Sequence, residues 1–585
     1  MSAPVQPIWF GPEDRSLFGS LHLPDRPSGV GVALCPSIGL DGEASQFAFR
    51  VLAARLASDG CTVLRFDYDG TGDSVGCGED PGRIDAWVAS IGEALALLRE
   101  SGCSVIHVVG ARLGVPLAVR AASADGGVAS LSCWYPTSTG SQFLRYQRAL
   151  RRLYGIDGSP EVEGDATEIP GYVLDAATTA DLKTLVAWSP DLTVPDALLV
   201  VDTAPPSATP PEVAPAPTVF VGHRATGAED LFGVELMKAA VDPADVDAIA
   251  EFIADRPRPE EPGQGRPVGR DSAVVATTDG ATIVERPVAL GDAGLFAMVT
   301  ERVADATTAG SLEGGPRYGH ALFLNAGSLH HIGPGRQWVE MSRAWAADGV
   351  RSLRLDLGGV GESPLTGPPG VLSSYPPSAV ADIDAGMEFL APSARDDVVL
   401  LGLCSGAYHC LLAAPQVGAG AVALVNPLRL PVPHGKGSTL VAYQDDEEVV
   451  APPESAASKR LLGGMRDRGV FTPLVRRLPD RFWTVANRVK GSDDPAEVFR
   501  RVVDSGVEVF IVCGPEEWRT VGRGRHAELR RMAETGRFHL AMIPTLDHAF
   551  HVADGRVTAV RLLGSWEKGE PMHTGSSRAD IVIIG

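Results

Sequence analysis

The chain has 585 residues, of which 44% are hydrophobic and 21% charged, and its formal net charge is −22. This length predicts more than one domain, and this composition predicts a buried core rather than wholesale disorder. The acidic balance opposes general binding to nucleic acids or anionic membranes, so we exclude both as partners.

The first residues, MSAPVQPIWF, do not form a basic segment followed by an apolar one. No uncharged apolar run approaches the roughly 20 residues that span a bilayer, so we expect a cytoplasmic protein. Eight cysteines are scattered along the chain without a CxxC pair or a His/Cys cluster at zinc spacing. We therefore expect neither disulfides nor a metal, and the sequence indicates no cofactor.

Two segments of the chain repeat each other. ASDGCTVLRFDYDGTGDS (57–74) aligns without a gap with AADGVRSLRLDLGGVGES (346–363). The shared residues are Leu64, Arg65, Asp67, Gly70, Gly72 and Ser74, which recur as Leu353, Arg354, Asp356, Gly359, Gly361 and Ser363. We interpret this as a tandem duplication. It predicts domains at 1–255 and 272–567, a Pro/Gly-rich linker at 256–271 and a tail at 568–585, whose end is compatible with an edge strand.

Strands and helices alternate in chain order in both halves. In the second half the pattern predicts strands at 320–327, 351–356 and 397–403, separated by helices at 336–349 and 378–391. In the first half, GVALCPSIGL (31–40), VLRFDYDG (63–70) and VIHVVGARLG (105–114) follow the same order. Such alternation predicts an α/β fold in which each half is a mostly parallel sheet covered by helices on both faces.

The segment GLCSG (402–406) follows the apolar strand predicted at 397–403. A strand, then glycine, any residue, a nucleophile, any residue and glycine, then a helix, is the nucleophile elbow of the α/β-hydrolase fold. The small residues two positions before and after the nucleophile let strand and helix approach each other. This spacing selects Cys404 as the nucleophile rather than Ser405. The helix dipole and a nearby imidazolium would favour the reactive thiolate.

Such a nucleophile needs a base and an acid, and in this fold they follow it in the order acid, then histidine. The strand at 506–513 runs into Glu516 and Glu517, and the strand at 538–543 is followed by Asp547 and His548. We predict His548 as the base, with His551 as the alternative. Glu517 is the predicted acid, with Glu516 second, and Asp547 is left out because its side chain should diverge from that of His548.

Further residues are expected around the nucleophile. The backbone N–H groups of Ser405 and of Gly327, in the loop LNAGSLHH (324–331), are the predicted oxyanion hole. His330 and His331 are candidates for substrate binding, and a position at the rim is an equal alternative for both.

The elbow of the first half, GARLG (110–114), places Arg112 where the nucleophile would stand. Arginine stays protonated and cannot form a covalent intermediate, so we predict that this half does not catalyse a reaction. Arg112 either pairs with a local carboxylate in a vestigial site or binds a carboxylate or phosphate of a ligand, such as a pantetheine arm.

Each half of the chain resembles a known family. The second half, with FLNAGSLHHIGPGRQW, GLCSGA and LDHAF, resembles α/β-hydrolases that carry Cys in the elbow, which include lactone hydrolases and acyl shuttles of bacterial biosynthesis. The first half, with LFGSLHLPD, ALCPSIGLDG, VLRFDYDGTGDS and GARLG, resembles hydrolase-like proteins associated with exosortase systems, with Arg in the elbow. Basic, aromatic stretches at 143–154 and 465–490 fall where this fold inserts helical caps.

The sequence therefore predicts an enzyme that transfers an acyl group through an acyl-S-Cys intermediate on Cys404, with a Cys-His-Glu triad. The partner would be a small-molecule acyl substrate, free or held on the phosphopantetheine of a carrier protein. A lactone, ester or thioester hydrolase is the alternative within enzymes. A non-catalytic binding scaffold is the alternative from another class.

Overall fold

A computed structural model gives the fold of the chain over a defined set of described residues. These are 5–153, 166–204, 213, 216–227, 231–232, 240–259, 268–278, 281–304, 316–327, 329–364, 374–433, 440–441, 495–521, 526–570 and 582–584. The protein is an α/β protein with mostly parallel mixed sheets covered by helices, which confirms the predicted fold class.

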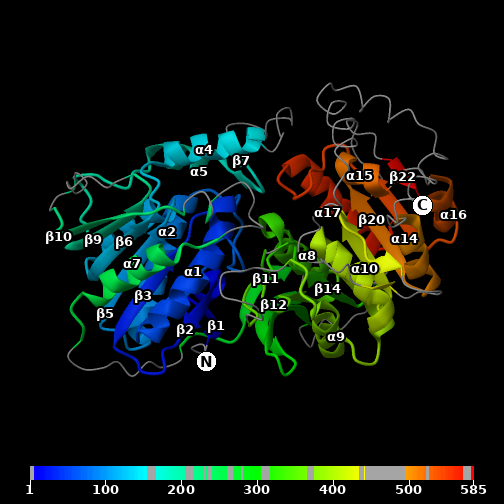
Figure 1. Cartoon of the computed structure of the whole chain (residues 1–585), viewed down its shortest axis with the longest axis horizontal. Helices are drawn as coiled ribbons and strands as arrows, with labels where there is room; N and C mark the ends of the chain where they lie inside the picture. Colours follow the sequence, from blue (N-terminus) through cyan, green and yellow to red (C-terminus); the bar gives the residue numbers. More distant parts are fainter. Residues whose placement is uncertain are drawn as a thin grey trace, which may run out of the picture. The chain divides into compact units, whose positions relative to one another are not determined.

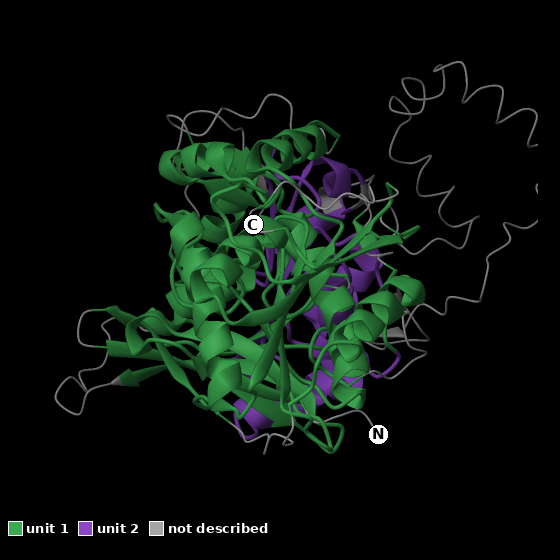
Figure 2. Ribbon diagram, turned by 90° about the vertical axis from the view of Figure 1, so that its left-hand side faces the viewer, with its two compact units in different colours: residues 1–376, 549–572 green, residues 377–548, 573–585 purple. Residues whose placement is uncertain are grey.

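The chain divides into two compact units (Figure 2). Unit 1 comprises 1–376 and 549–572, and unit 2 comprises 377–548 and 573–585. The predicted domain boundaries stay a prediction, and most of the predicted linker, 260–267, lies outside the described residues.

One sheet lies wholly in unit 1, with strand order β1-β2-β4-β3-β5-β6-β9-β10. The strands β1 and β2 are antiparallel to their neighbours, and the other six run parallel. The bounds are β1 (Val5–Phe10), β2 (Leu17–His22), β3 (Val30–Cys35), β4 (Thr62–Phe66), β5 (Val105–Ala111), β6 (Val128–Trp134), β9 (Ala197–Asp202) and β10 (Val219–Arg224).

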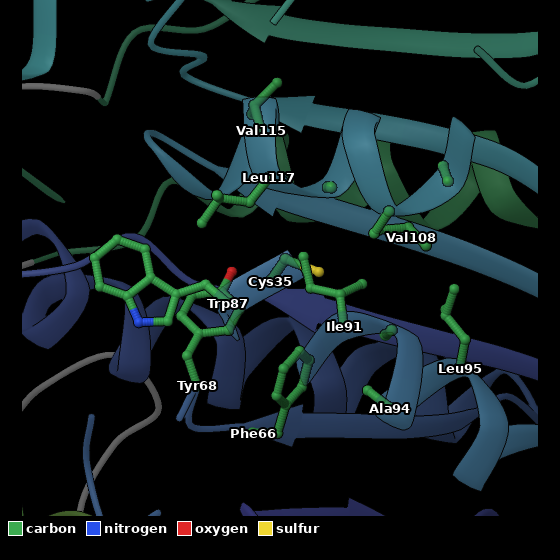
Figure 3. Packing of buried hydrophobic residues seen from close by; sticks show 14 of the residues in the cluster. Cys35, Phe66, Tyr68, Trp87, Ile91, Ala94, Leu95, Val108, Val115 and Leu117 are labelled. Carbon is green, nitrogen blue, oxygen red and sulfur yellow. The ribbon is translucent and has the colours of Figure 1, made fainter. Parts of the chain in front are cut away.

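Helices cover both faces of this sheet (Figure 1). On one face, α1 (Leu40–Ser58) and α7 (Pro243–Ala254) pack on Val32 and Leu34 of β3. On the other, α2 (Arg83–Glu100) and α3 (Gly114–Asp125) pack on the alternate residues of the same strand, and Figure 3 shows their side chains around Cys35. Because successive residues of a strand point to opposite faces, an apolar strand like β3 supplies both cores.

A smaller group of elements follows β6 in unit 1. It comprises α4 (Gly140–Leu153), the antiparallel pair β7 (Thr167–Ile169) and β8 (Tyr172–Leu174), and α5 (Ala176–Thr184). The helix α4 corresponds to the cap predicted at 143–154, and its Arg151 pairs with Glu168 of β7 at 2.8 Å. The second predicted cap, at 465–490, lies outside the described residues.

The rest of unit 1 carries a second set of strands in the order β11-β12-β13-β15-β14. The first three are antiparallel to their neighbours, whereas β14 and β15 are parallel to each other. The bounds are β11 (Ala273–Thr278), β12 (Ala281–Leu290), β13 (Leu295–Ala304), β14 (His320–Leu324), α8 (Gln337–Ala347), β15 (Arg351–Leu355) and α17 (Ala553–Glu567). The strands predicted at 320–327 and 351–356 and the helix predicted at 336–349 are thus confirmed with shorter bounds.

Unit 2 has the parallel strands β16-β17-β20-β21, with β22 antiparallel to β21 at the edge. The residues of β16, β17 and β20 are all buried, as expected for parallel strands covered on both faces. The bounds are α9 (Ala379–Leu390), β16 (Val398–Leu403), α10 (Ser405–Val417), β17 (Ala421–Val425), β18 (Val432–Pro433), β19 (Leu440–Val441), α14 (Pro495–Asp504), β20 (Glu508–Cys513), α15 (Pro515–Val521), α16 (His526–Ala533), β21 (Phe538–Met542) and β22 (Val582–Ile584).

Within unit 1, the two repeated segments contact each other reciprocally. Arg65 of the first donates to Glu362 of the second at 2.8 Å, and Arg354 of the second pairs with Asp73 of the first. Arg65 corresponds to Arg354 and Asp73 to Glu362 in the ungapped alignment. Each ion pair therefore has a counterpart in which the repeats exchange roles.

The backbone contacts have corresponding acceptors, although their donors, Arg336 and Arg50, do not align with each other. Arg336 donates to the carbonyl oxygens of Gly72 and Ser74, both at 2.7 Å. Arg50 donates to the corresponding carbonyl oxygens of Gly361 and Ser363. This exchange of roles is the pattern of the isologous interface in a two-fold symmetric dimer, built here inside one chain.

Candidate active site

The predicted nucleophile Cys404 lies in a tight turn between β16 and α10. Its backbone φ is 55° and ψ is −109°, a conformation that a residue with a Cβ rarely adopts. The turn is held by hydrogen bonds from the Cys404 N–H to the Val425 carbonyl at 3.0 Å and from the Tyr408 N–H to the Cys404 carbonyl at 3.2 Å. The sulfur thus belongs to a residue placed at the N-terminus of α10 by a strained backbone.

Glycine at position 402 is required by packing. A Cβ added to Gly402 would overlap the backbone of Gly406 in the first turn of α10. The strand and the helix can approach each other this closely only because Gly402 has no side chain. The steric reason that selected Cys404 from the sequence is therefore present in the structure.

Cys404, His548 and Glu517 form one hydrogen-bonded series within unit 2. His548 lies in the loop after β21, where its Nδ1 is 2.7 Å from Oε1 of Glu517 and its ring forms a side-chain hydrogen bond with Cys404. Glu517 lies on α15, directly after β20, and is 1% exposed, whereas Glu516 beside it is exposed. The structure thus brings together the three residues predicted as a triad, whereas the alternative acid, Glu516, is exposed to solvent.

The electrostatics of this series centre on His548. Burial alone would lower its pKa, but its hydrogen bonds with Cys404 and Glu517 and the charges of these two groups raise the pKa to about 10. The imidazole is therefore protonated at neutral pH, where it stabilises negative charge on the sulfur beside it.

Asn426 is a residue of this site that sequence reasoning missed. It follows β17 with a positive φ of 46°, and its Nδ2 donates to the carbonyl oxygens of Asp547 and His548, both at 2.9 Å. Its Oδ1 accepts from the N–H of Gly514 at 2.8 Å, in the loop before α15. One amide thus joins the loop of the predicted base to that of the predicted acid. A polar residue directly after a buried strand next to the elbow strand was the available signal.

The predicted oxyanion donors lie in different units. Ser405 is buried as the first residue of α10 in unit 2, so its N–H belongs to the N-terminus of that helix. Gly327 lies in unit 1 with a positive φ of 61°, and His551, the alternative base, also belongs to unit 1. The assignment of Ser405 and Gly327 to an oxyanion hole stays a prediction.

His331 is held in an internal ion-pair network of unit 1. Its Nδ1 is 2.8 Å from Oδ2 of Asp356 and its Nε2 is 2.6 Å from Oδ2 of Asp73. Burial would lower its pKa, but these two carboxylates raise it to about 10. Both ring nitrogens are therefore engaged with protein carboxylates. The predicted substrate contacts of His331 and of the half-buried His330 stay predictions.

Arg112 of unit 1 has a positive φ like that of Cys404. It follows β5 with a positive φ of 52°, and its Nε is 3.2 Å from Oδ2 of the buried Asp41. Its guanidinium carbon also lies 4.9 Å from the ring centre of Tyr146 and 5.3 Å from that of Phe232. Of the two roles expected for Arg112, the geometry favours pairing with a local carboxylate.

Two further features bear on cofactors and membranes. Among the described residues, no three His, Cys, Asp or Glu side chains are grouped so that they could hold a metal ion. In the same part of the chain, no helix combines the length and the apolar character needed to cross a membrane.

The comparisons with known proteins give similarity in fold only. No protein-family model matches the chain, and no curated protein matches it. Similar solved structures include mouse α/β-hydrolase domain-containing protein 10, at 17% identity over 43% of this chain and 98% of that one (TM-score 0.29). They also include Est1E of Butyrivibrio proteoclasticus with bound ferulic acid, at 15% identity over 43% of this chain and 98% of that one (TM-score 0.31). The Xanthomonas campestris α/β serine hydrolase without a lid, XC6422, matches at 14% identity over 43% of this chain and 95% of that one (TM-score 0.27). None of these similarities supports a conclusion about activity.

Proposed function

We propose that the protein is an acyltransferase that holds an acyl group as a thioester on Cys404. The observation that supports this proposal is the hydrogen-bonded series of Cys404, His548 and Glu517, with the sulfur in a strained turn at a helix N-terminus. An isolated buried cysteine would need none of these features.

The reaction has two steps. The sulfur of Cys404, as the thiolate paired with the protonated His548, attacks the carbonyl carbon of a thioester or ester, and Glu517 orients the imidazolium. The N–H of Ser405 is a donor for the oxyanion. Collapse of the tetrahedral intermediate breaks the bond to the leaving group, which takes the proton from His548. The acyl group then passes to a second acceptor by the reverse sequence. His548 takes the proton of the acceptor, the acceptor attacks the thioester carbonyl, and the bond to sulfur breaks, which restores the thiolate beside the protonated His548.

Transfer to another acceptor suits a thiol nucleophile. A thioester on Cys404 lies close in free energy to a thioester on a phosphopantetheine thiol, so exchange between the two is reversible. An acyl group on a serine hydroxyl would lie lower. We therefore place a small acyl substrate, free or on a carrier protein of bacterial specialised metabolism, ahead of a lactone or ester that is hydrolysed.

Intact-protein mass spectrometry tests the covalent step. The full chain is incubated with acyl thioesters of N-acetylcysteamine, and the gain of one acyl mass is followed. We expect the adduct in the wild type and in Ser405→Ala, and its loss in Cys404→Ala. Absence of an adduct with every acyl donor, together with unchanged turnover by Cys404→Ala, overturns the proposal and favours a binding scaffold.

A second measurement separates transfer from hydrolysis. The acylated protein is isolated and mixed with a thiol acceptor or an amine acceptor, and the products are compared with those formed in buffer. Transfer predicts that an acceptor captures most of the acyl group. Release to water at the same rate with and without acceptors would instead identify a hydrolase.

A further inference from the structure

Unit 1 contains a cavity of about 50 Å³ away from the elbow residue Arg112, which does not line it. It lies between the loop after β3, the first turns of α1 and the β7–β8 hairpin, and its polar lining includes Ser37, Glu43, Gln46, Asp67 and His330. A water molecule needs roughly 10–15 Å³ of such space, so the cavity can hold a ligand of several heavy atoms.

Two carboxyl groups, those of Glu43 and Asp67, line this cavity and form no ion pair within the described residues. Glu43 accepts a hydrogen bond from the Tyr172 hydroxyl at 3.2 Å, and Asp67 accepts one from the Gln46 amide at 3.2 Å. Within the described parts of the chain, neither carboxyl forms an ion pair with a basic side chain. Both are therefore held by neutral donors alone, which leaves acceptor capacity free for a ligand.

Two further polar atoms at the cavity have no partner. Ser37 is 4% exposed, and its buried Oγ has no hydrogen bond to any described residue; within the same residues, the buried Nε2 of His330 has none either. Burial and the nearby charge of His331 lower the pKa of His330 to about 4, so its ring is neutral at neutral pH and offers one acceptor nitrogen. Unpaired buried polar atoms are costly, and a ligand that bonds to them removes that cost.

The chemistry of the lining defines the class of ligand. Carboxylates and a neutral imidazole accept hydrogen bonds, and Ile38, Trp87 and Ile169 add an apolar wall. We propose that this cavity is a binding site for the ammonium group of a short alkylamine, with Glu43 and Asp67 as its counter-ions. A primary ammonium brings three donors and one positive charge, which match two carboxylates and a free acceptor.

The ionisation of the two carboxyls is consistent with this ligand. Burial raises the pKa of Glu43 to about 7, and burial together with the charge of Asp73 raises that of Asp67 to about 7. A cation in the cavity would supply the missing opposite charge. An inorganic metal ion fits less well, because no three His, Cys, Asp or Glu side chains of the described residues are grouped to ligate one.

Calorimetric titration of the full chain at pH 8 tests the proposal. The probe is n-propylammonium chloride, and n-propanol and sodium propionate are controls of the same length. We expect saturable binding of propylammonium that is at least tenfold tighter than that of either control. Equal affinity for propanol would identify an apolar cavity only, preferred binding of propionate would identify an anion site, and absence of binding would leave no amine site; each result overturns the proposal.

Variants connect the binding to this cavity. Glu43→Gln and Asp67→Asn should each weaken propylammonium binding at least tenfold, whereas Asp25→Asn, which removes an exposed carboxylate of unit 1, should not change it. Asp67 also accepts the Asp73 N–H, so Glu43→Gln decides the outcome if Asp67→Asn does not fold. Wild-type affinity in folded Glu43→Gln overturns the proposal.

The site is independent of the proposed acyl transfer. The Cys404→Ala chain cannot form an acyl thioester at that position, but it keeps every residue of the cavity. It should therefore bind propylammonium with the affinity of the wild type. Loss of binding in this variant would overturn the assignment of the amine to the unit 1 cavity.

Discussion

Two residues that each follow a parallel strand share a positive backbone φ but differ in the chemistry of their side chains. Cys404 has a φ of 55° and Arg112 a φ of 52°, each between a parallel strand and a helix. Such a conformation costs about 1–3 kcal/mol in each case. At Arg112 no nucleophile benefits from it, because the guanidinium pairs with Asp41 and lies over aromatic rings. A positive φ at the elbow position therefore reflects the strand-turn-helix geometry alone. Whether the position can act as a nucleophile depends on its side chain.

The pKa of His548 makes the proposed acylation sensitive to pH. The protonated ring supplies the proton to the leaving group, so the rate of adduct formation should be lost as pH rises through about 10. In Glu517→Gln the negative charge that raises this pKa is gone, so the loss should occur at lower pH. Rates measured from pH 6 to 11 check this. Glu516→Gln, which changes an exposed neighbour, should keep the wild-type profile.

Asn426 should act by positioning the base and the acid. Asn426→Ala removes the three hydrogen bonds that join the loops of His548 and Gly514. Small displacements of reacting groups are costly, so we expect the acylation rate to fall by about tenfold or more. The pH above which the acylation rate is lost should also be lower than in the wild type, as in Glu517→Gln. Gln416→Ala removes an amide that bonds only to the α10 backbone, and it should leave both unchanged.

The elements of the fold differ in how clearly the sequence predicts them. Buried parallel strands are continuous apolar runs, so β16 was predicted to within one residue. The antiparallel strands β11, β12 and β13 were not predicted; β12 alternates buried and half-exposed residues and carries charged side chains, which weakens the apolar signal. Asn426 was not predicted as a site residue, and the ion pairs of His331 were not predicted, for another reason. Their partners lie far away in sequence, and only the folded chain brings His331 to Asp73.

The contact between β16 and α10 can be tested by adding one methyl group. Gly402→Ala places a Cβ against the backbone of Gly406, which cannot move away without breaking the turn at Cys404. We expect a loss of about 1–3 kcal/mol in the free energy of unfolding, together with slower acylation.

Gly92→Ala is the matched control for that substitution. Gly92 lies within α2, and a Cβ there meets no atom within 4 Å. Because alanine favours a helix over glycine, we expect a gain of about 0.5–1 kcal/mol. Denaturant unfolding of both variants measures the difference. Equal effects of the two substitutions would contradict the steric requirement at the elbow.

At the scale of the molecule, the two repeated segments form a reciprocal interface in unit 1. The two ion pairs, Arg65 with Glu362 and Arg354 with Asp73, are related by the same exchange of repeats. The surroundings differ, because Asp73 also contacts His331, whereas the histidine beside Arg65 is His22. Burial first, and then the charge of Arg65, lower the pKa of His22 to about 3, so that histidine is neutral. A charged histidine, His331, therefore contacts the pair of Arg354 with Asp73, whereas the histidine that contacts the pair of Arg65 with Glu362 is neutral.

This difference predicts unequal responses to alkaline pH. His331 has a folded-state pKa of about 10, raised above its usual 6.5, so its stabilising contribution is complete below pH 6.5 and is lost as pH rises through about 10. Asp73→Asn removes one carboxylate that raises this pKa, which leaves excess positive charge on the buried Arg354 and His331. We expect a loss of about 3–5 kcal/mol at pH 7. This loss should shrink toward pH 9, because His331 of the variant then gives up its proton.

Glu362→Gln should destabilise the chain by breaking the counterpart pair with Arg65, but His22 is already neutral and has no proton to release in this range. The difference in unfolding free energy from the wild type should therefore stay nearly constant between pH 7 and 9 for Glu362→Gln and decrease for Asp73→Asn. Urea unfolding of the three chains at a series of pH values measures both differences. Parallel behaviour of the two variants would show that His331 does not carry the charge that distinguishes the two halves of this interface.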